Sequence, residues 1–401
     1  MAVDRLTFYQ RLAQSSDKRI LLVVLDGLGG LPREPGGPTE LEEASTPVMD
    51  RLAREGENGL MTPVLPGVAP GSGPAHLALF GYDPIAHPVG RGVLAALGVG
   101  IDLRPGDVAA RINLCTLDRQ GQILDRRAGR ISSEEAVPLI RRLAEVDVGL
   151  ETIVRLVKEY RACVVFRGSE LDGRIADTDP QRIGVPPLTP VPLVAEATDM
   201  ANQVACFIEG AQEALADHED ANGVLLRGFD SYAPLPSFGE LYRLRAAAVA
   251  TYPMYRGVAR LAGMVPIEVG DTLEELADGV RSCGEYDFVY LHYKYTDSRG
   301  EDGDFGAKVR EIERADELIG MVLDCGFDVI TVTGDHSTPS RLRMHSWHPV
   351  PVLLWSDCCR QDGAKDFSEK ACGIGSLGPI GSIDLLPLAL AHAGRLGKFG
   401  A

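Results

Sequence analysis

The sequence predicts an α/β fold, a doubly wound and mostly parallel sheet with a smaller α+β domain inserted into it. Three apolar, largely β-branched or aromatic runs, at 19–25, 287–293 and 328–332, have the composition of strands that are buried on both faces. An amphipathic segment at 305–325 precedes the last of these runs. Buried strands that alternate with helices are typical of a sheet covered by helices on both sides.

The inserted domain is predicted from a change of pattern after Val89. Strands become shorter there, and residues 109–123 favour a hairpin whose turn is at 118–121. Strand and helix signals of the first kind resume near Leu241. We therefore expect residues 1–89 and 241–401 to form a core domain, and residues 90–240 to form the insertion.

Composition excludes several classes of partner. The net charge of −17 argues against nucleic acid or an anionic membrane, so an anionic substrate would need locally clustered arginine. No apolar run is long enough to span a bilayer, and residues 1–20 lack the apolar core of a signal peptide, so we expect a cytoplasmic protein. The eight cysteines include one close pair, Cys358 and Cys359, and no CxxC. We expect reduced thiols, neither a disulfide framework nor a zinc cage.

The stretch 327–355 carries the strongest sign of chemistry. Asp335 and His336 follow a predicted buried strand, and His345 and His348 come shortly after them. Imidazole and carboxylate are ligands for zinc, manganese or iron, and the carboxyl ends of parallel strands are where α/β proteins place their sites. A polar loop with solvated histidines is the alternative.

Two further residues could join such a site. Asp26 follows the first predicted strand, where a carboxylate can be a metal ligand or a helix cap. Ser72 lies in a turn rich in glycine and proline just before a predicted helix, where backbone N–H groups favour negative charge. It could be a nucleophile activated by a metal, or a plain N-cap.

Two charged segments have both a binding and a solvent-exposed interpretation. Asp297 and Glu301 could supply two oxygen ligands, or they could belong to an acidic loop at 298–304. The segment 125–130, DRRAGR, places three arginines in a glycine-containing turn. Guanidinium groups held there could bind phosphate or carboxylate with two hydrogen bonds each, although charge clusters are usually solvated.

Six motifs in fixed order indicate a family: Asp26 after the first strand, GSG-x-AHL-x-LFGYDP around Ser72, DRRAGR, TD-x-x-GEDGD, TGDHSTP and HS-x-x-PVP. The sequence resembles the cofactor-independent phosphoglycerate mutases of the archaeal type, in the alkaline phosphatase superfamily. The resemblance covers nearly the whole chain, including the insertion. It implies an alkaline-phosphatase-like sheet and the interconversion of 3-phosphoglycerate and 2-phosphoglycerate without bisphosphoglycerate.

The resemblance also implies roles for single residues. Ser72 would be the nucleophile that becomes phosphoserine, flanked by two divalent metal ions. One ion would be held by Asp26, Ser72, Asp335 and His336, and the other by Asp297, His345 and the residue four after Asp297. The small anionic phosphorylated substrate would be held by residues of the insertion: Arg111, Asn113, Asp125, Arg126, Arg127, Arg130, Asp179 and Arg227.

Three positions depart from the family pattern. Glu301 stands where histidine is usual, His348 where an acid or asparagine is usual, and Gln181 where histidine is frequent. Glu301 could still ligate, giving an oxygen-rich site that favours manganese or magnesium, with zinc as an alternative. His348 could instead replace the missing imidazole, or the second metal could bind weakly and activity be altered. We favour the first two explanations together: Glu301 ligates and His348 replaces the missing imidazole.

Other functions stay open from the residues alone. A phosphatase or a phosphosugar mutase of the same superfamily would share the metal site, and a non-catalytic homologue would bind a metal or phosphometabolite. The oligomeric state is also open and includes a homo-oligomer.

Overall fold

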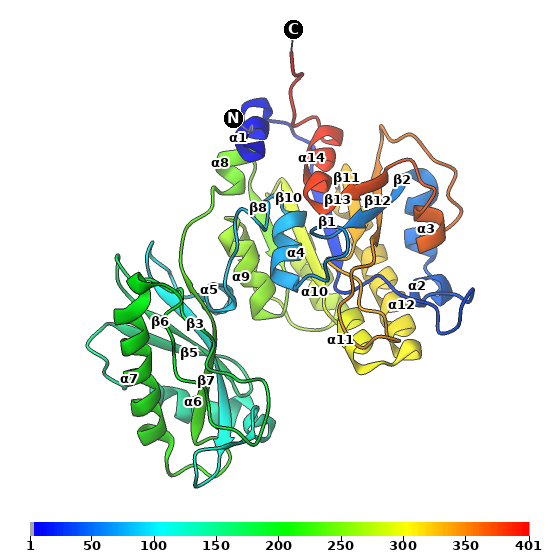
Figure 1. Ribbon diagram of the computed structural model, residues 1–401. Helices are drawn as coiled ribbons and strands as arrows, with labels where there is room; N and C mark the ends of the chain where they lie inside the picture. Colours follow the sequence, from blue (N-terminus) through cyan, green and yellow to red (C-terminus); the bar gives the residue numbers. More distant parts are fainter. Residues whose placement is uncertain (1–3, 401) are drawn as a thin grey trace. The chain divides into compact units, whose positions relative to one another are not determined.

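The computed structural model describes residues 4–400, and the chain divides into two compact units (Figure 1). Unit 1 contains the described residues up to Pro88, the segment Pro236–Tyr252 and the described residues from Ala262 onward. Unit 2 contains Val89–Leu235 and Pro253–Leu261. The predicted insertion, 90–240, overlaps unit 2 but leaves out 253–261, which packs with that unit.

Unit 1 carries the elements that flank the predicted site. Its helices are α1 (Arg5–Leu12), α2 (Glu40–Glu43), α3 (Pro47–Glu55), α4 (Ser72–Leu79), α8 (Phe238–Tyr242), α10 (Leu273–Arg281), α11 (Tyr295–Asp302), α12 (Phe305–Val322), α13 (Glu369–Cys372) and α14 (Ser382–His392). Its strands are β1 (Ile20–Leu25), β2 (Glu57–Thr62), β8 (Ala246–Val249), β9 (Val265–Ile267), β10 (Phe288–Tyr293), β11 (Val329–Thr333), β12 (Val350–Ser356) and β13 (Gly378–Gly381).

These strands form one sheet in the order β13-β2-β12-β11-β1-β10-β8-β9. β1 pairs in parallel with both β10 and β11, and β8 and β9 continue the parallel part. β12 is antiparallel to β11 and to β2. The predicted fold class, α/β with a mostly parallel sheet, is confirmed.

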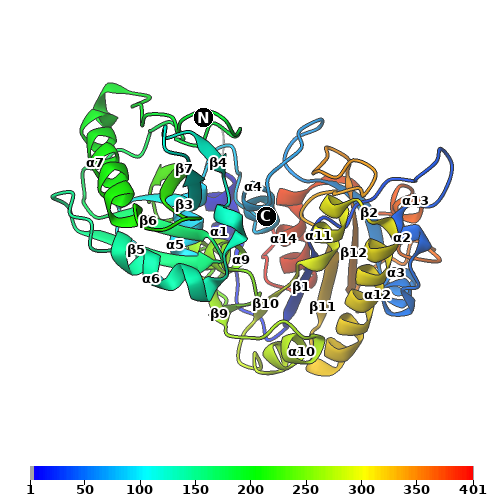
Figure 2. The same cartoon turned by 90° about the horizontal axis from the view of Figure 1, so that it is seen from below.

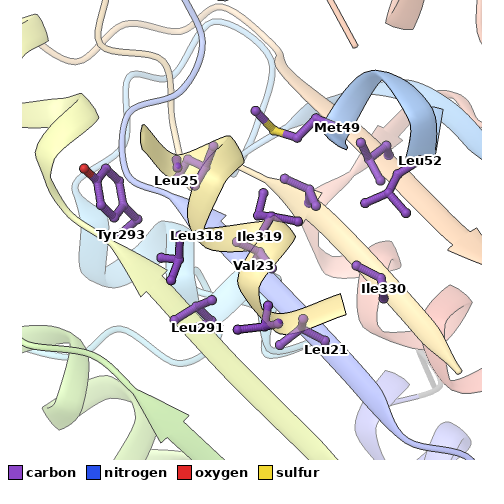
Figure 3. Packing of buried hydrophobic residues seen from close by; sticks show 14 of the residues in the cluster. Leu21, Val23, Leu25, Met49, Leu52, Leu291, Tyr293, Leu318, Ile319 and Ile330 are labelled. Carbon is purple, nitrogen blue, oxygen red and sulfur yellow. The ribbon is translucent and has the colours of Figure 1, made fainter. Parts of the chain in front are cut away.

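Side chains of β1 point alternately to the two faces of the sheet, and both faces are covered. Leu21 and Val23 belong to a core cluster with Leu318 and Ile319 of α12, and Figure 3 shows these four side chains close together. Figure 2 shows α12 and α14 on opposite faces of the sheet. Burial on both faces explains why β1 is a continuous apolar run and not an alternating one.

Unit 2 is an antiparallel sheet packed against helices. Its strands are β3 (Val108–Leu117), β4 (Ile123–Asp125), β5 (Thr152–Lys158), β6 (Arg161–Phe166) and β7 (Gly223–Ser231). Its helices are α5 (Arg91–Gly98), α6 (Ser133–Leu143), α7 (Thr198–Leu215) and α9 (Pro253–Leu261). β3 pairs with β4, β6 and β7, so the predicted 109–123 hairpin corresponds to β3 and β4.

One expected loop is a helix. Residues 298–304 are predicted to form an acidic loop, but most of them belong to α11. The helix passes close to the loop after β11 at Gly300, where a Cβ would lie 2.2 Å from the carbonyl oxygen of Thr338. Glycine permits this close approach because it has no Cβ.

Within the described residues, none of the helices combines the length and the apolar character that crossing a bilayer requires.

Because α5 packs closely against α9 in unit 2, we expect that one added methyl group at Gly257 lowers the stability of the protein. A Cβ at Gly257 would lie 2.0 Å from the carbonyl oxygen of Leu94, so Gly257→Ala must push the two helices apart. We expect it to lower the free energy of unfolding by about 1–3 kcal/mol, measured by urea denaturation. Gly284→Ala, where a Cβ would meet open space, is the control and should change little. Equal stability of the two variants would contradict this account.

Candidate active site

The predicted ligands come together at one edge of the unit 1 sheet. Asp26 follows β1, Asp297 lies in α11 directly after β10, and Asp335 follows β11. Because β10, β1 and β11 are adjacent and parallel, their carboxyl ends meet at the same edge. All three carboxylates are buried.

A first group consists of Asp26, Asp335 and His336, whose ligand atoms all lie within 4.8 Å of one another. His336 Nε2 is 3.4 Å from Asp26 Oδ1 and 3.2 Å from Asp335 Oδ2. The backbone N–H groups of Gly27 and His336 both donate to Asp335 Oδ1, each at 3.0 Å, and hold that carboxylate in place.

Ser72 lies beside this group. Its Oγ is 3.2 Å from His336 Nε2. Ser72 is the first residue of α4, Gly71 is the cap, and no side chain caps this helix. The hydroxyl of Ser72 is therefore not used as an N-cap, the alternative role that the sequence left open.

A second group consists of Asp297, His336 and His345, again with ligand atoms within 4.8 Å of one another. His345 Nε2 is 3.5 Å from Asp297 Oδ1, and the rings of His336 and His345 stack with their centroids 3.6 Å apart. His345 Nδ1 donates to the carbonyl oxygen of Pro70 at 2.8 Å. That bond leaves Nε2 as the ring nitrogen with a lone pair.

Thr338 sets the tautomer of His336 in the same way. Its hydroxyl donates to Asp297 Oδ1 at 2.7 Å, so its oxygen accepts from His336 Nδ1 at 3.0 Å. His336 Nε2 then carries a lone pair that faces two carboxylates and the Ser72 hydroxyl. Burial also lowers the pKa of His336, which keeps the ring neutral.

The two groups have the chemistry of divalent metal sites. Lone pairs of imidazole nitrogen and of buried carboxylates face one another within a few ångströms, an arrangement that a bound cation would stabilise. Metal-binding histidines typically donate their second nitrogen to a carbonyl or hydroxyl oxygen, as His336 and His345 do here. The residues present therefore fit two adjacent cations.

Glu301 and His348 are placed differently from these ligands. Glu301 lies one helical turn after Asp297, and its Oε1 is 3.9 Å from His345 Nε2. Burial, followed by the nearby Asp297, raises the pKa of Glu301. His348 Nδ1 pairs with Ser346 Oγ at 3.0 Å and its ring stacks on Trp347, so the structure does not bring it into either group.

Sequence reasoning assigned no role to two buried histidines of the site. His76, one turn after Ser72 in α4, donates from Nδ1 to the carbonyl oxygen of Ser72 at 2.8 Å, and this nitrogen is 3.3 Å from Asp335 Oδ2. His292 in β10 has Nε2 3.4 Å from Asp26 Oδ2. A histidine inside a buried strand, and another four residues after the candidate nucleophile, were the signals that could have revealed them.

Lys294 was also missed, although it lies directly after β10. Its ammonium group is 3.0 Å from Asp26 Oδ2 and forms an ion pair with Asp297, so it links one carboxylate of each group. Burial would lower the pKa of Lys294, but the two carboxylates outweigh it and raise the pKa. Lys294 therefore stays charged beside the carboxylates.

Lys308 of α12 holds the loops that carry the ligands. It is fully buried, and its Nζ donates to the carbonyl oxygens of Gly27, Gly29 and Thr338 at 2.9, 3.0 and 2.8 Å. Burial lowers its pKa, and the attraction of buried Glu40 and other carboxylates opposes this. One ammonium thus ties the loop after β1 to the loop after β11.

In unit 2, three predicted substrate-binding residues share contacts. Arg126 binds the buried carboxylate of Asp179 through two hydrogen bonds, Nε at 2.8 Å and Nη2 at 2.7 Å, and Arg227 Nη1 is 3.5 Å away from the same group. Burial would raise the pKa of Asp179, but the hydrogen bonds from Arg126 and the Gln181 backbone, together with the charges of Arg126 and Arg227, outweigh it and the pKa is lowered. Arg111 of β3 is the register partner of Arg227 on β7.

The remaining predicted substrate-binding residues of unit 2 lie in the segment 125–130 and on β3. Asp125 accepts from the backbone N–H groups of Arg127 and Gly129, both at 2.8 Å, so it shapes the turn. The side chains of Arg127 and Arg130 are exposed on that turn, and Asn113 is buried in β3.

The comparisons with known proteins agree with one another. A family model described as 2,3-bisphosphoglycerate-independent phosphoglycerate mutase matches residues 53–220. A probable enzyme of that name from Thermus thermophilus is 49% identical over the whole of both chains, and one from Thermotoga neapolitana is 45% identical with the same coverage. The chain belongs to this family.

Two solved structures support the family assignment at the level of the fold. The cofactor-independent phosphoglycerate mutase from Thermoplasma acidophilum is 32% identical with a TM-score of 0.69, and covers 94% of this chain and 100% of its own. A protein from Pyrococcus horikoshii is 32% identical with a TM-score of 0.85, covering 96% and 100%. The family predicted from the motifs is confirmed, as is the prediction of an enzyme of the phosphoglycerate mutase type.

Removing the ammonium of Lys308 should loosen the ligand-bearing loops. Lys308→Met removes the ammonium donor of three buried carbonyl oxygens and the positive charge that attracts buried Glu40. We expect a loss of about 3 kcal/mol or more in the free energy of unfolding, measured by urea denaturation, together with weaker binding of manganese. Lys370→Met removes an exposed ion pair with Glu42 and is the control. A stable Lys308→Met variant with unchanged metal affinity would refute the loop-holding role.

Proposed function

We propose that this chain interconverts 3-phosphoglycerate and 2-phosphoglycerate without bisphosphoglycerate, through a phosphoserine at Ser72. The observation that carries the proposal is the position of Ser72 Oγ, 3.2 Å from His336 Nε2, in a histidine that belongs to both ligand groups. Family membership supports the choice of substrate. With this activity we expect a role in glycolysis and gluconeogenesis, and hence a cytoplasmic protein.

Two divalent ions would be held by the two groups. Asp26, Ser72, Asp335 and His336 would hold one, and Asp297, Glu301 and His345 the other. Bound there, the ions would lower the pKa of the serine hydroxyl and neutralise charge on the transferring phosphoryl group. Carboxylate oxygens dominate the two sets, which favours manganese or magnesium over zinc. We keep His348 only as an alternative to Glu301.

The chain's own residues account for the rest of the transfer. Ser72 Oγ would lose its proton and bond to phosphorus while the bond from phosphorus to the substrate oxygen breaks, and that oxygen takes up a proton. The second hydroxyl of glycerate would then attack the phosphoserine in reverse and restore Ser72. Lys294, held charged by Asp26 and Asp297, would stabilise negative charge near the phosphoryl group.

The arginines of unit 2 would bind the anionic parts of the substrate. Arg126 and Arg227 are held by Asp179, so their guanidinium groups are fixed before substrate arrives. Arg111 would join them from the adjacent strand. Asp125 would keep its turn in shape for Arg127 and Arg130, whose exposed side chains are available to a ligand, and Asn113 would contribute an amide.

Replacement of the nucleophile tests the proposal directly. Ser72→Ala should reduce conversion of 3-phosphoglycerate by at least about four orders of magnitude, because it removes the hydroxyl oxygen that would bond to phosphorus. The assay contains manganese and no bisphosphoglycerate, and 2-phosphoglycerate is measured. A phosphoserine trapped by acid quench should appear in the native chain and not in Ser72→Ala. Ser376→Ala, outside the site, is the control.

The product distinguishes the proposal from its nearest rival. A phosphatase of the same superfamily would release inorganic phosphate from 3-phosphoglycerate, whereas a mutase would form 2-phosphoglycerate with little phosphate. Phosphate as the main product, or full activity in Ser72→Ala, would reject the mutase assignment.

Glu301 should set the metal preference. Its carboxylate lies 3.9 Å from His345 Nε2, at the place where a histidine would make the second group richer in nitrogen. We expect Glu301→His to raise activity with zinc relative to manganese about tenfold, measured by titrating each metal into metal-free enzyme. Asp302→His, the next residue in α11, is the control. An unchanged zinc-to-manganese ratio would show that Glu301 does not ligate.

A further inference from the structure

A second cluster of metal-binding side chains lies in unit 1, outside the site described above. Glu57 begins β2, Cys358 and Cys359 follow the end of β12, and His392 ends α14. Ligand atoms of Glu57, Cys359 and His392 all lie within 4.8 Å of one another. No pair of these residues has the spacing of a familiar zinc motif, which is why a zinc cage is not expected from the sequence.

The two sulfurs and the imidazole face one another. His392 Nδ1 is 3.6 Å from Cys358 Sγ and 4.0 Å from Cys359 Sγ, and His392 Nε2 is 3.9 Å from Glu57 Oε2. Tetrahedral zinc with bonds of 2.0–2.3 Å requires ligand atoms to lie about 3.3–3.8 Å from one another. The two separations between His392 Nδ1 and the sulfurs are within a few tenths of an ångström of that range. Glu57 faces the other ring nitrogen, so its carboxylate would have to turn toward the ion to become the fourth ligand.

The donors also suit a borderline-soft cation. Thiolate and imidazole select zinc over magnesium or manganese, and a carboxylate is a common fourth ligand. Ser356 Oγ now pairs with His392 Nδ1 at 2.7 Å and lies 3.4 Å from Cys358 Sγ, so one hydroxyl occupies the middle of the cluster. If the Ser356 hydroxyl rotated away, the imidazole of His392 and the sulfur of Cys358 could bind a cation.

The cluster is open to solvent. A cavity of about 460 Å³ is lined by Glu57, Cys358, Arg360, Ser376, Ala391 and His392. All eight cysteines are free thiols, so both sulfurs are available. An ion could therefore reach the cluster without unfolding of the chain.

The cluster lies at the opposite edge of the sheet from the phosphoryl site. β12 runs antiparallel to β11, and Ser356 pairs with Val329, the first residue of β11. Asp335 and His336 follow the other end of the same strand. An ion bound by the cysteines would therefore be separated from the two catalytic ions by the length of β11.

We propose that Cys358, Cys359, His392 and Glu57 bind a zinc-type divalent ion that ties together the ends of β2, β12 and α14. The role is structural: one ion links three segments that the chain brings together only on folding. Binding would release the thiol protons, and it is independent of the mutase chemistry.

Cobalt distinguishes this cluster from the phosphoryl site. The two phosphoryl-site groups contain nitrogen and oxygen donors alone, so a thiolate-to-cobalt charge-transfer band in the near ultraviolet reports the cysteine cluster. The full-length protein, freed of metal and reconstituted with cobalt, should show this band. Cys358→Ser/Cys359→Ser should abolish it and bind one ion fewer per chain. Cys206→Ser, an exposed thiol of α7, should leave it unchanged.

Activity and stability complete the test. The double variant should keep the native rate with saturating manganese. With manganese saturating the phosphoryl site, added zinc should raise the thermal unfolding temperature of the native chain but not that of the variant. His392→Ala, which leaves both thiols in place, should weaken cobalt binding and shift the band. Absence of the band, its survival in the double variant, or a Cys358–Cys359 disulfide in the protein purified under reducing conditions would overturn the proposal.

Discussion

The parallel pairing of β10, β1 and β11 is the constraint on which the phosphoryl site depends. Each strand is followed at its carboxyl end by an acidic ligand, and the pairing brings Asp26, Asp297 and Asp335 to one edge although they are far apart in sequence. Both faces of the sheet are covered by apolar side chains, and a slip of one strand by one residue would displace the acidic residue that follows it. The chemistry therefore rests on packing of the core beneath it.

Charge balance is the second requirement. Buried carboxylates repel one another in a region of low dielectric constant, and two lysines offset them from different sides. Lys294 contacts the carboxylates of Asp26 and Asp297, whereas Lys308 binds backbone carbonyl oxygens in the loops that follow β1 and β11. The first stabilises the charges and the second fixes their positions, which explains why a site with so many acidic groups can stay preorganised.

The two ends of the same sheet have different donor chemistry. The carboxyl edge presents oxygen and nitrogen atoms around a serine, which suits hard divalent ions and phosphoryl transfer. The edge where β12 ends presents sulfur, nitrogen and one carboxylate, which suits zinc. This separation by donor type would let one chain hold ions for catalysis and for stability without exchange between the sites.

By itself, the sequence determined the buried strands, the α/β class and the family, and it indicated candidate ligands next to strand ends, because each of these leaves a local signal in composition or motif. It did not reveal His76, His292 or Lys308, since a buried polar residue looks the same in sequence whether it lines a site or fills a core. It predicted a loop where α11 forms, and it could not show that Gly300 of this helix lies against Thr338. Only the tertiary structure decided that His348 lies apart from the ligand groups and that Cys358, Cys359 and His392 meet, because those distances depend on how distant segments pack.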